Sequence, residues 1–245
     1  MPTDVSAPRI KPPPIPLSLA CTLLVGALIV ATFVLVTPVE AQDVDPRLDE
    51  AIRWYTGMTG TVDDQRAREL LLEALEAPNP ISRMWLARCH SRGRMFFEHD
   101  EARADQIAAE VLDEIERLAY RGVAEAAFLM GTTNDEGLAM EIDAAMAAAW
   151  FHRAADQAHV LAQHNLGNAY YGGRGLPQSD AMAVYWWHRA AEQGDAIPQR
   201  ELASMYEQGR GVERDLAEAE RWYRLSAEKG NAQAREALER LTSQR

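Results

Sequence analysis

A tandem repeat with a period of 36 residues restricts the fold of this chain more than any other feature. Tryptophan, glycine and alanine each recur three times at this interval. The recurring residues are Trp150, Trp186 and Trp222, Gly137, Gly173 and Gly209, and Ala147, Ala183 and Ala219. Residues 159–194 share 12 identities in 36 positions with the preceding unit and 12 with the following unit, whereas unrelated sequences would share about two. Such a repeat predicts stacked structural units with one continuous core.

The pattern within one unit predicts two helices. In the first helix, Ala162, Leu166 and Tyr170 are four residues apart and therefore fall on one face. The second helix is predicted over about 180–193, where Trp186 and several alanines form the stripe that is buried. Because every unit pairs two helices and alanine is abundant, we predict an all-α fold.

Glycines mark the places where the helices of a unit end. Gly173 ends the first helix, because glycine readily takes the left-handed conformation that a helix end often requires. Gly167, inside the same helix, is expected to let a neighbouring helix approach closely. Gly194 ends the second helix, and Asp195 is placed to cap the helix that follows.

The repeat continues upstream in an irregular form. Gly122 lies 36 residues before Ala158 and 72 before Gly194, so these residues mark equivalent points. Farther upstream, a helix is expected to start at Asn79, where a proline follows, and a longer helix should span about 101–121. We therefore divide the chain into an export segment (1–41), degenerate helical repeats (45–122), three regular repeats (123–158, 159–194 and 195–230) and a C-terminal cap helix (231–245).

The N-terminus carries the features of an export signal. Leu17–Val36 is an uncharged stretch of 20 residues that two basic residues precede. The sequence Val39–Ala41 before Gln42 fits a signal-peptidase site, which predicts a cleaved signal peptide. An uncleaved signal anchor is the alternative, because about 20 apolar residues suffice to span a bilayer. Both interpretations place the remaining chain outside the cytoplasm, either free in the periplasm or anchored to the inner membrane and facing the periplasm.

Charge and metal-ligand patterns exclude several classes of function. Asp and Glu number 37 against 25 Lys and Arg, so the net charge of −12 argues against a nucleic-acid partner. Cys89 is the single cysteine after residue 41 and is expected to be a small buried hydrophobic residue. His159 and His164 lack acidic or cysteine ligands nearby in sequence, so we predict no metal site and no cofactor.

One short motif invites a catalytic interpretation. Ser226-Ala-Glu-Lys229 matches the Ser-x-x-Lys pattern of penicillin-recognising enzymes, but the Ser-Asp-Asn and Lys-Thr-Gly partner motifs are absent from the sequence. In the repeat, Ser226 takes the place of Ala154 and Ala190, which is a small packing position. Lys229 lies in the last turn of a helix, where a cation suits the helix dipole. We therefore predict that the chain is not an enzyme.

The repeat residues resemble the Sel-one-like repeat (SLR) family of the tetratricopeptide-like superfamily. The matching motifs are Ala-x-x-x-Leu-Gly-x-x-Tyr-x-x-Gly-x-Gly at 162–175 and Ala-x-x-Trp-Trp-x-x-Ala-Ala-Glu-x-Gly at 183–194. The chain departs from them at Asn134, Ala139 and Ala203. The resemblance implies a right-handed α-solenoid that serves as an adaptor or scaffold in protein complexes, with motif residues that pack rather than catalyse.

The same resemblance places a partner-binding groove on the concave face, which the first helices line. The residues expected to point into it are Thr132, Asp135, His164, Asn168, Tyr171, Arg200, Ser204 and Glu207. Side chains of these types can hold a peptide through hydrogen bonds and aromatic contacts. We expect a non-enzymatic scaffold for a protein or peptide of the bacterial cell envelope, in contact with membrane only through an uncleaved N-terminal segment. The alternative is a module that binds or hydrolyses cell-wall fragments or β-lactams through Ser226 and Lys229.

Overall fold

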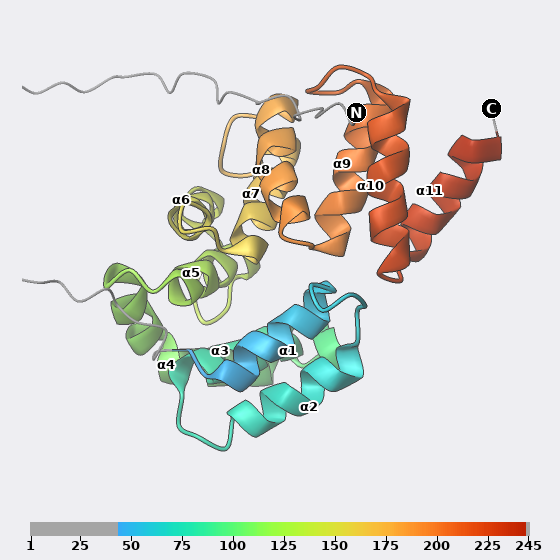
Figure 1. Ribbon diagram of the computed structural model, residues 1–245. Helices are drawn as coiled ribbons and strands as arrows, with labels where there is room; N and C mark the ends of the chain where they lie inside the picture. Colours follow the sequence, from blue (N-terminus) through green and yellow to red (C-terminus); the bar gives the residue numbers. More distant parts are fainter. Residues whose placement is uncertain (1–43, 244–245) are drawn as a thin grey trace, which may run out of the picture. The chain divides into compact units, whose positions relative to one another are not determined.

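The computed structural model describes residues 44–243, which all lie in one unit of the chain. Every regular element in these residues is helical (Figure 1). The helices are α1 (Pro46–Thr56), α2 (Asp64–Ala74), α3 (Pro80–Arg92), α4 (Glu101–Tyr120), α5 (Ala124–Glu136), α6 (Ala144–Ala155), α7 (Val160–Gly172), α8 (Asp180–Glu192), α9 (Ala196–Gln208), α10 (Leu216–Glu228) and α11 (Ala232–Ser243), with a short 3₁₀ turn, η1 (Arg94–Phe96), after α3.

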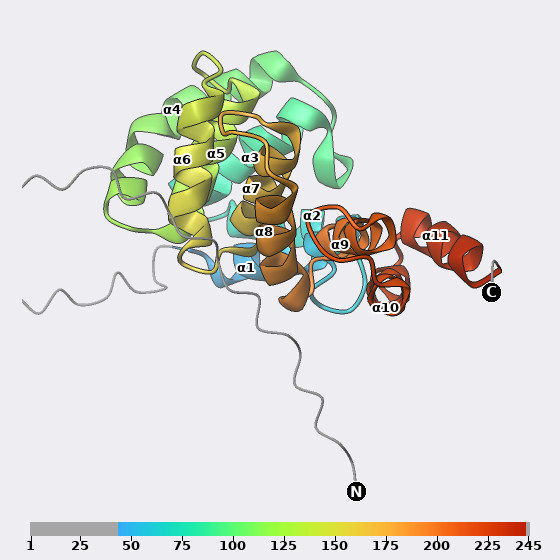
Figure 2. The ribbon, with the colours of Figure 1, turned by 90° about the horizontal axis from the view of Figure 1, so that it is seen from above.

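Helices that follow one another in sequence pack against one another. The most extensive contacts join the pairs α1–α2, α3–α4, α5–α6, α7–α8 and α9–α10, and each pair also contacts the next. Figures 1 and 2 show the regular pairs following one another from α5 to α10, with α11 against the last pair. This arrangement confirms the predicted all-α solenoid.

Capping residues fix where the helices begin. Asp195 accepts a hydrogen bond from Ile197 N at 3.1 Å, and Asn79 accepts from the backbone at the start of α3, as the sequence predicts. Gly137, Gly173 and Gly209 end the first helices of the regular pairs with φ values of 77°, 66° and 68°. These left-handed positions recur because each pair reverses direction through the same turn.

A glycine within a first helix allows close packing against the second helix. A Cβ atom on Gly167 would overlap the indole ring of Trp187, and one on Gly131 would overlap the ring of Phe151. In the last regular pair Ala203 takes the glycine's place, and the opposing residue is Tyr223. Tyr223 is smaller than Trp187 but larger than Phe151, so ring size alone does not follow the change from glycine to alanine.

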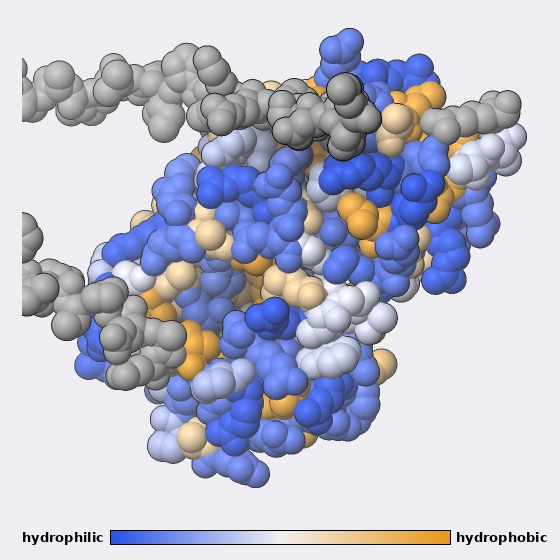
Figure 3. Space-filling view, viewed as in Figure 1, coloured by the Kyte–Doolittle hydropathy of each residue, from blue (hydrophilic) through white to orange (hydrophobic). Residues whose placement is uncertain are grey.

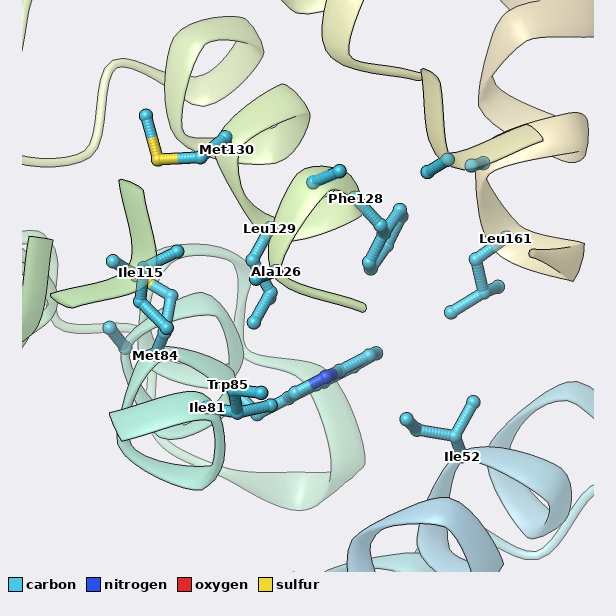
Figure 4. Packing of buried hydrophobic residues seen from close by; sticks show 14 of the residues in the cluster. Ile52, Ile81, Met84, Trp85, Ile115, Ala126, Phe128, Leu129, Met130 and Leu161 are labelled. Carbon is cyan, nitrogen blue, oxygen red and sulfur yellow. The ribbon is translucent and has the colours of Figure 1, made fainter. Parts of the chain in front are cut away.

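The core follows the inner faces of the helix pairs. Trp85 is fully buried, and Figure 4 shows its ring among Ile52, Phe128 and Leu161, which come from three different helices. The repeat-related Trp150, Trp186 and Trp222 are also buried. In contrast, the surface in Figure 3 is mostly hydrophilic, with small separate hydrophobic patches.

The predicted export segment, residues 1–41, lies outside the described residues. Among the helices of residues 44–243, none has both the length and the apolar character needed to cross a membrane.

Candidate binding site

A cavity of about 330 Å³ lies between the N-terminal helices and the regular repeats. Its lining comes from α1, α2 and α3 on one side and from α7, α9 and the turn before α11 on the other. The lining residues are Tyr55, Thr56, Val62, Asp64, Arg88, Leu161, His164, Asn165, Asp195, Ala196, Ile197, Gly230 and Asn231. Apolar walls with a few charged groups are typical of small-molecule binding cavities.

The first and last helix pairs meet at one end of this cavity. Lys229, which follows α10, donates a hydrogen bond from Nζ to the carbonyl of Gly57 at 2.8 Å. The backbone N–H of Val62 donates to the carbonyl of Lys229 at 3.3 Å. These bonds join residues far apart in sequence, so the turn after α1 and the end of α10 together bound the cavity.

Arg88 supplies a buried positive charge to the cavity. It is 5% exposed, and its guanidinium carbon lies 4.7 Å from the Trp85 ring centroid and 5.0 Å from that of Phe128. Its Nε and Nη1 atoms are buried and donate no hydrogen bond to any of residues 44–243. Burial lowers the pKa of Arg88, because removal from water disfavours the charged form.

The carboxylate nearest to Arg88 is bound to other groups. Glu136 lies 3.9 Å from Arg88 Nε, but it accepts hydrogen bonds from Arg94 Nη2 and Ser91 Oγ, each at 2.7 Å. Burial would raise the pKa of Glu136, but Arg88 and Arg94 outweigh that effect and hold the pKa below its ordinary value. Glu136 is therefore a well-paired carboxylate, whereas Arg88 keeps unused donors.

Acidic and neutral polar groups complete the cavity lining. Asp64, at the start of α2, has a buried Oδ1 atom without a hydrogen-bond partner in the described part of the chain. Burial and the neighbouring Asp63 raise the pKa of Asp64. On the opposite wall, Nδ1 of His164 lies 3.1 Å from Oδ2 of Asp195, so this pair is already formed. Arg88 and Asp64 are thus the lining residues with buried polar atoms that have no hydrogen-bond partner among residues 44–243.

A second polar cluster, formed by Glu125, Trp85 and His159, includes the indole ring next to the Arg88 guanidinium. Glu125 accepts a hydrogen bond from Trp85 Nε1 at 2.6 Å, and its other oxygen lies 2.8 Å from Nε2 of His159. Burial opposes ionisation of Glu125, but His159 and Trp85 hold the pKa of this carboxyl below its usual value. The cluster fixes the indole ring on which Arg88 stacks.

The structure brings only some of the predicted groove residues together. His164 lines the 330 Å³ cavity, while Asp135 and Asn168 line a smaller cavity of about 110 Å³ between α5, α6 and α7. Asp135 forms an ion pair with Arg174 at 2.9 Å. Asn168 is exposed, although its Oδ1 accepts a hydrogen bond from Trp187 Nε1 at 3.0 Å.

The other predicted groove residues make local contacts. Thr132 is buried and donates to the carbonyl of Leu129, so its hydroxyl faces the helix itself. Arg200 pairs with the adjacent Glu201, and Ser204 accepts a hydrogen bond from Gln208. Glu207 accepts two hydrogen bonds from Arg240 and one from Tyr223. Glu207 thereby fastens α11 to the last helix pair.

Tyr171 takes part in an exposed aromatic and basic cluster at the end of α7. Its hydroxyl accepts a hydrogen bond from Arg210 Nη1 at 2.9 Å, and the Arg210 guanidinium carbon lies 4.9 Å from the ring centroid. Arg210 is also held by the carboxylate of Asp180 at 3.0 Å. We call Asn168, Tyr171, Arg174 and Arg210 the α7 edge. It presents Tyr and Arg side chains, which are frequent in protein interfaces.

The Ser-x-x-Lys motif has a packing role in the structure. Ser226 is fully buried, and its hydroxyl donates to the carbonyl of Ala196 at 2.6 Å. Lys229 is bound to Gly57, so neither side chain is arranged as a nucleophile and its base. The geometry therefore gives no support to a catalytic role for this motif.

The remaining candidates are also built into the packing. Cys89 is buried, and burial raises the pKa of its thiol to about 12. His159 and His164 point to separate carboxylates, Glu125 and Asp195. Residues 44–243 contain no group of three or more His, Cys, Asp or Glu side chains able to hold a metal ion.

Stacked helix pairs, with first helices that end at a left-handed glycine, define an α-solenoid of the tetratricopeptide type. The sequence profile of the Sel1 repeat matches residues 54–79, 124–159, 160–195 and 199–231. The chain therefore belongs to the Sel1 repeat family. This finding confirms the resemblance that the repeat motifs carry, and Sel1 repeats typically mediate protein–protein interaction.

Two solved structures illustrate the relationship. A protective antigen of uropathogenic Escherichia coli strains that displays an SLR fold is 29% identical, with a TM-score of 0.53 over 78% of this chain and 39% of the antigen. A Sel1 repeat protein from Oxalobacter formigenes is 32% identical, with a TM-score of 0.49 over 73% of this chain and 50% of that protein. The chain thus spans half or less of these relatives. No curated protein matches the chain.

Proposed function

We propose that the chain is a non-enzymatic scaffold that holds a protein or peptide partner in the bacterial cell envelope. The observation that carries this proposal is the α7 edge, where the exposed Asn168 and Tyr171 and the half-buried Arg210 are fixed in position by neighbouring side chains. Side chains that are already held in place lose little conformational freedom on binding. The protein-binding role of Sel1 repeats supports the same conclusion.

The envelope location rests on the N-terminal sequence. The uncharged stretch Leu17–Val36 and the small residues before Gln42 support export across the inner membrane. Fractionation of the native host, followed by sequencing of the protein's N-terminus, tests this part. Recovery from the periplasm with an N-terminus at Gln42 is expected. Recovery in the cytoplasm with an intact N-terminus would contradict the proposed location.

In-cell crosslinking followed by mass spectrometry tests the scaffold. The double variant Tyr171→Ala with Arg210→Ala should lose a partner that the unchanged protein captures reproducibly. A matched control is Tyr120→Ala with Arg153→Ala, because Arg153 likewise lies over the Tyr120 ring, at 5.8 Å, but outside the α7 edge. Equal loss in both variants, or no reproducible partner, would count against the proposal.

The alternative module for cell-wall fragments or β-lactams makes a different prediction. Its proposed nucleophile, Ser226, is buried and hydrogen bonded to Ala196. We therefore expect no covalent labelling by a fluorescent penicillin. Labelling that disappears in Ser226→Ala would favour the alternative over the scaffold.

A further inference from the structure

The 330 Å³ cavity contains a charge arrangement that the scaffold role does not use. Arg88 carries two buried N–H donors without acceptors among residues 44–243, and Asp64 carries one buried oxygen without a donor. Unsatisfied buried polar groups are rare in native proteins, and each costs free energy. A ligand that supplies the missing partners would remove both costs.

The fold holds Arg88 in place without satisfying it. The Trp85 and Phe128 rings fix the guanidinium by stacking, and Glu125 fixes Trp85 in turn. Glu136 could have bound Arg88, but Arg94 and Ser91 occupy its oxygens. The guanidinium is therefore preorganised, and its planar set of donors matches the two oxygens of a carboxylate.

The size and the lining of the cavity limit the ligand. A volume of about 330 Å³ is at the lower end of the range for small-molecule sites. Leu161 and Ile197 supply apolar surface on the wall opposite Arg88 and Asp64, so an uncharged aliphatic portion can be accommodated. The ligand must therefore be small and must carry both an acceptor group and a donor group.

We propose that this cavity binds a small carboxylate that also carries an N–H donor, with the carboxylate on Arg88 and the donor on Asp64. A free amino acid and the carboxyl end of a peptide share this chemistry. The site does not depend on the α7 edge. Failure of the partner-capture experiment therefore leaves it unaffected, and its own failure leaves the scaffold unaffected.

The test is a thermal-shift and calorimetric screen of the whole chain. The probes are free L-amino acids, dipeptides, the same dipeptides as C-terminal amides, and octapeptides that end in the same two residues. We expect at least one acid to bind, and its amide to bind at least about tenfold more weakly, because charged hydrogen bonds are lost. An octapeptide that binds as well as its dipeptide identifies the end of a polypeptide as the source. Binding of the short probes alone identifies a free small molecule.

Substitution of Arg88 separates a binding role from a structural one. Arg88→Met should weaken the best acid at least about tenfold, while the unliganded variant keeps or exceeds the parent melting temperature, because a buried unpaired charge is removed. Arg189→Met is the matched control, since Arg189 also stacks on a tryptophan, at 5.4 Å from Trp186, but does not line the cavity. The control should bind as the parent does.

A second variant keeps the test decisive if Arg88→Met fails to fold. Ile197 is 46% exposed and lines the cavity, so Ile197→Trp should obstruct binding with little effect on folding. The proposal is overturned if no acid binds, if amides bind as tightly as acids, or if the best acid binds Ile197→Trp with unchanged affinity.

Discussion

The N-terminal helices α1–α4 and the regular pairs α5–α10 are both built from paired helices, but different residues fill the space between the helices. In the regular pairs, equivalent contacts recur: His152 packs edge-on against Trp186 at 5.5 Å, and His188 packs against Trp222 at 5.7 Å. In α3, the buried surface includes Arg88, whose charge no repeat-related residue shares. Residues that recur in every repeat thus serve packing. A residue that breaks the repeat, such as Arg88, marks a place where a ligand site can arise.

The largest effect is expected in the regular part. Trp186 is 3% exposed, so Trp186→Ala should lower the free energy of unfolding by about 3–5 kcal/mol through lost burial and a residual cavity. Urea denaturation measures the change. Trp54→Ala is the control, because Trp54 is only half-buried, and it should cost clearly less. A loss below about 1 kcal/mol at Trp186 would mean that the repeat does not depend on its tryptophans.

A smaller effect is expected where the two regions meet. Arg94→Met removes the main hydrogen-bonding partner of Glu136 and should cost about 2–3 kcal/mol, because a buried carboxylate loses part of its pairing. Arg88→Met should cost little or nothing, since Arg88 makes no hydrogen bond to Glu136. Chemical denaturation of both variants compares them, and equal losses would contradict the distinction between the two arginines.

The pH dependence of stability follows from the same carboxylate. The pKa of Glu136 is held below its ordinary value of 4.5, so the folded state binds fewer protons than the unfolded state near that pH. Its contribution is full above the unfolded pKa and is lost as the pH falls through the folded pKa. Stability should therefore decline below about pH 4.5, and the decline should be shallower in Arg94→Met. Melting temperatures between pH 3 and 7 measure it.

A further comparison concerns the position that follows the second helix of each pair. Gly122, Gly194 and Gly230 have φ values of 97°, 98° and 92°, and Ala158 occupies the equivalent position at 64°. A left-handed alanine is strained, so Ala158→Gly should stabilise the fold by up to about 1 kcal/mol, less the entropy that glycine adds to the unfolded chain. Gly194→Ala should act in the opposite direction. A stabilising Gly194→Ala would show that the turn does not require this conformation.

The fold could be predicted from the sequence because the residues that recur every 36 positions are the residues that pack between helices. Spacing of Trp186 and Gly173 located the helix pair, and the predicted helix at 180–193 is α8, Asp180–Glu192. Arg88 and Asp64 were missed, since nothing in a one-dimensional pattern brings α2 and α3 to the end of α10. The available signal was a charged residue three positions after Trp85, within the stretch 84–89 whose other residues are apolar.

The smallest effect is expected at Ser226, and it sharpens the comparison within the regular part. Ser226 stands where the two preceding units have Ala154 and Ala190. Alanine therefore fits this packing position in the other units. Ser226→Ala removes the hydrogen bond to the Ala196 carbonyl and should cost about 1 kcal/mol or less. Urea denaturation beside a Ser204→Ala control, which alters a half-buried hydroxyl on α9, measures this cost. A loss of several kcal/mol would mean that the hydroxyl closing α10 onto α9 is indispensable. The last repeat would then depend on a polar contact that its alanine-bearing counterparts do without.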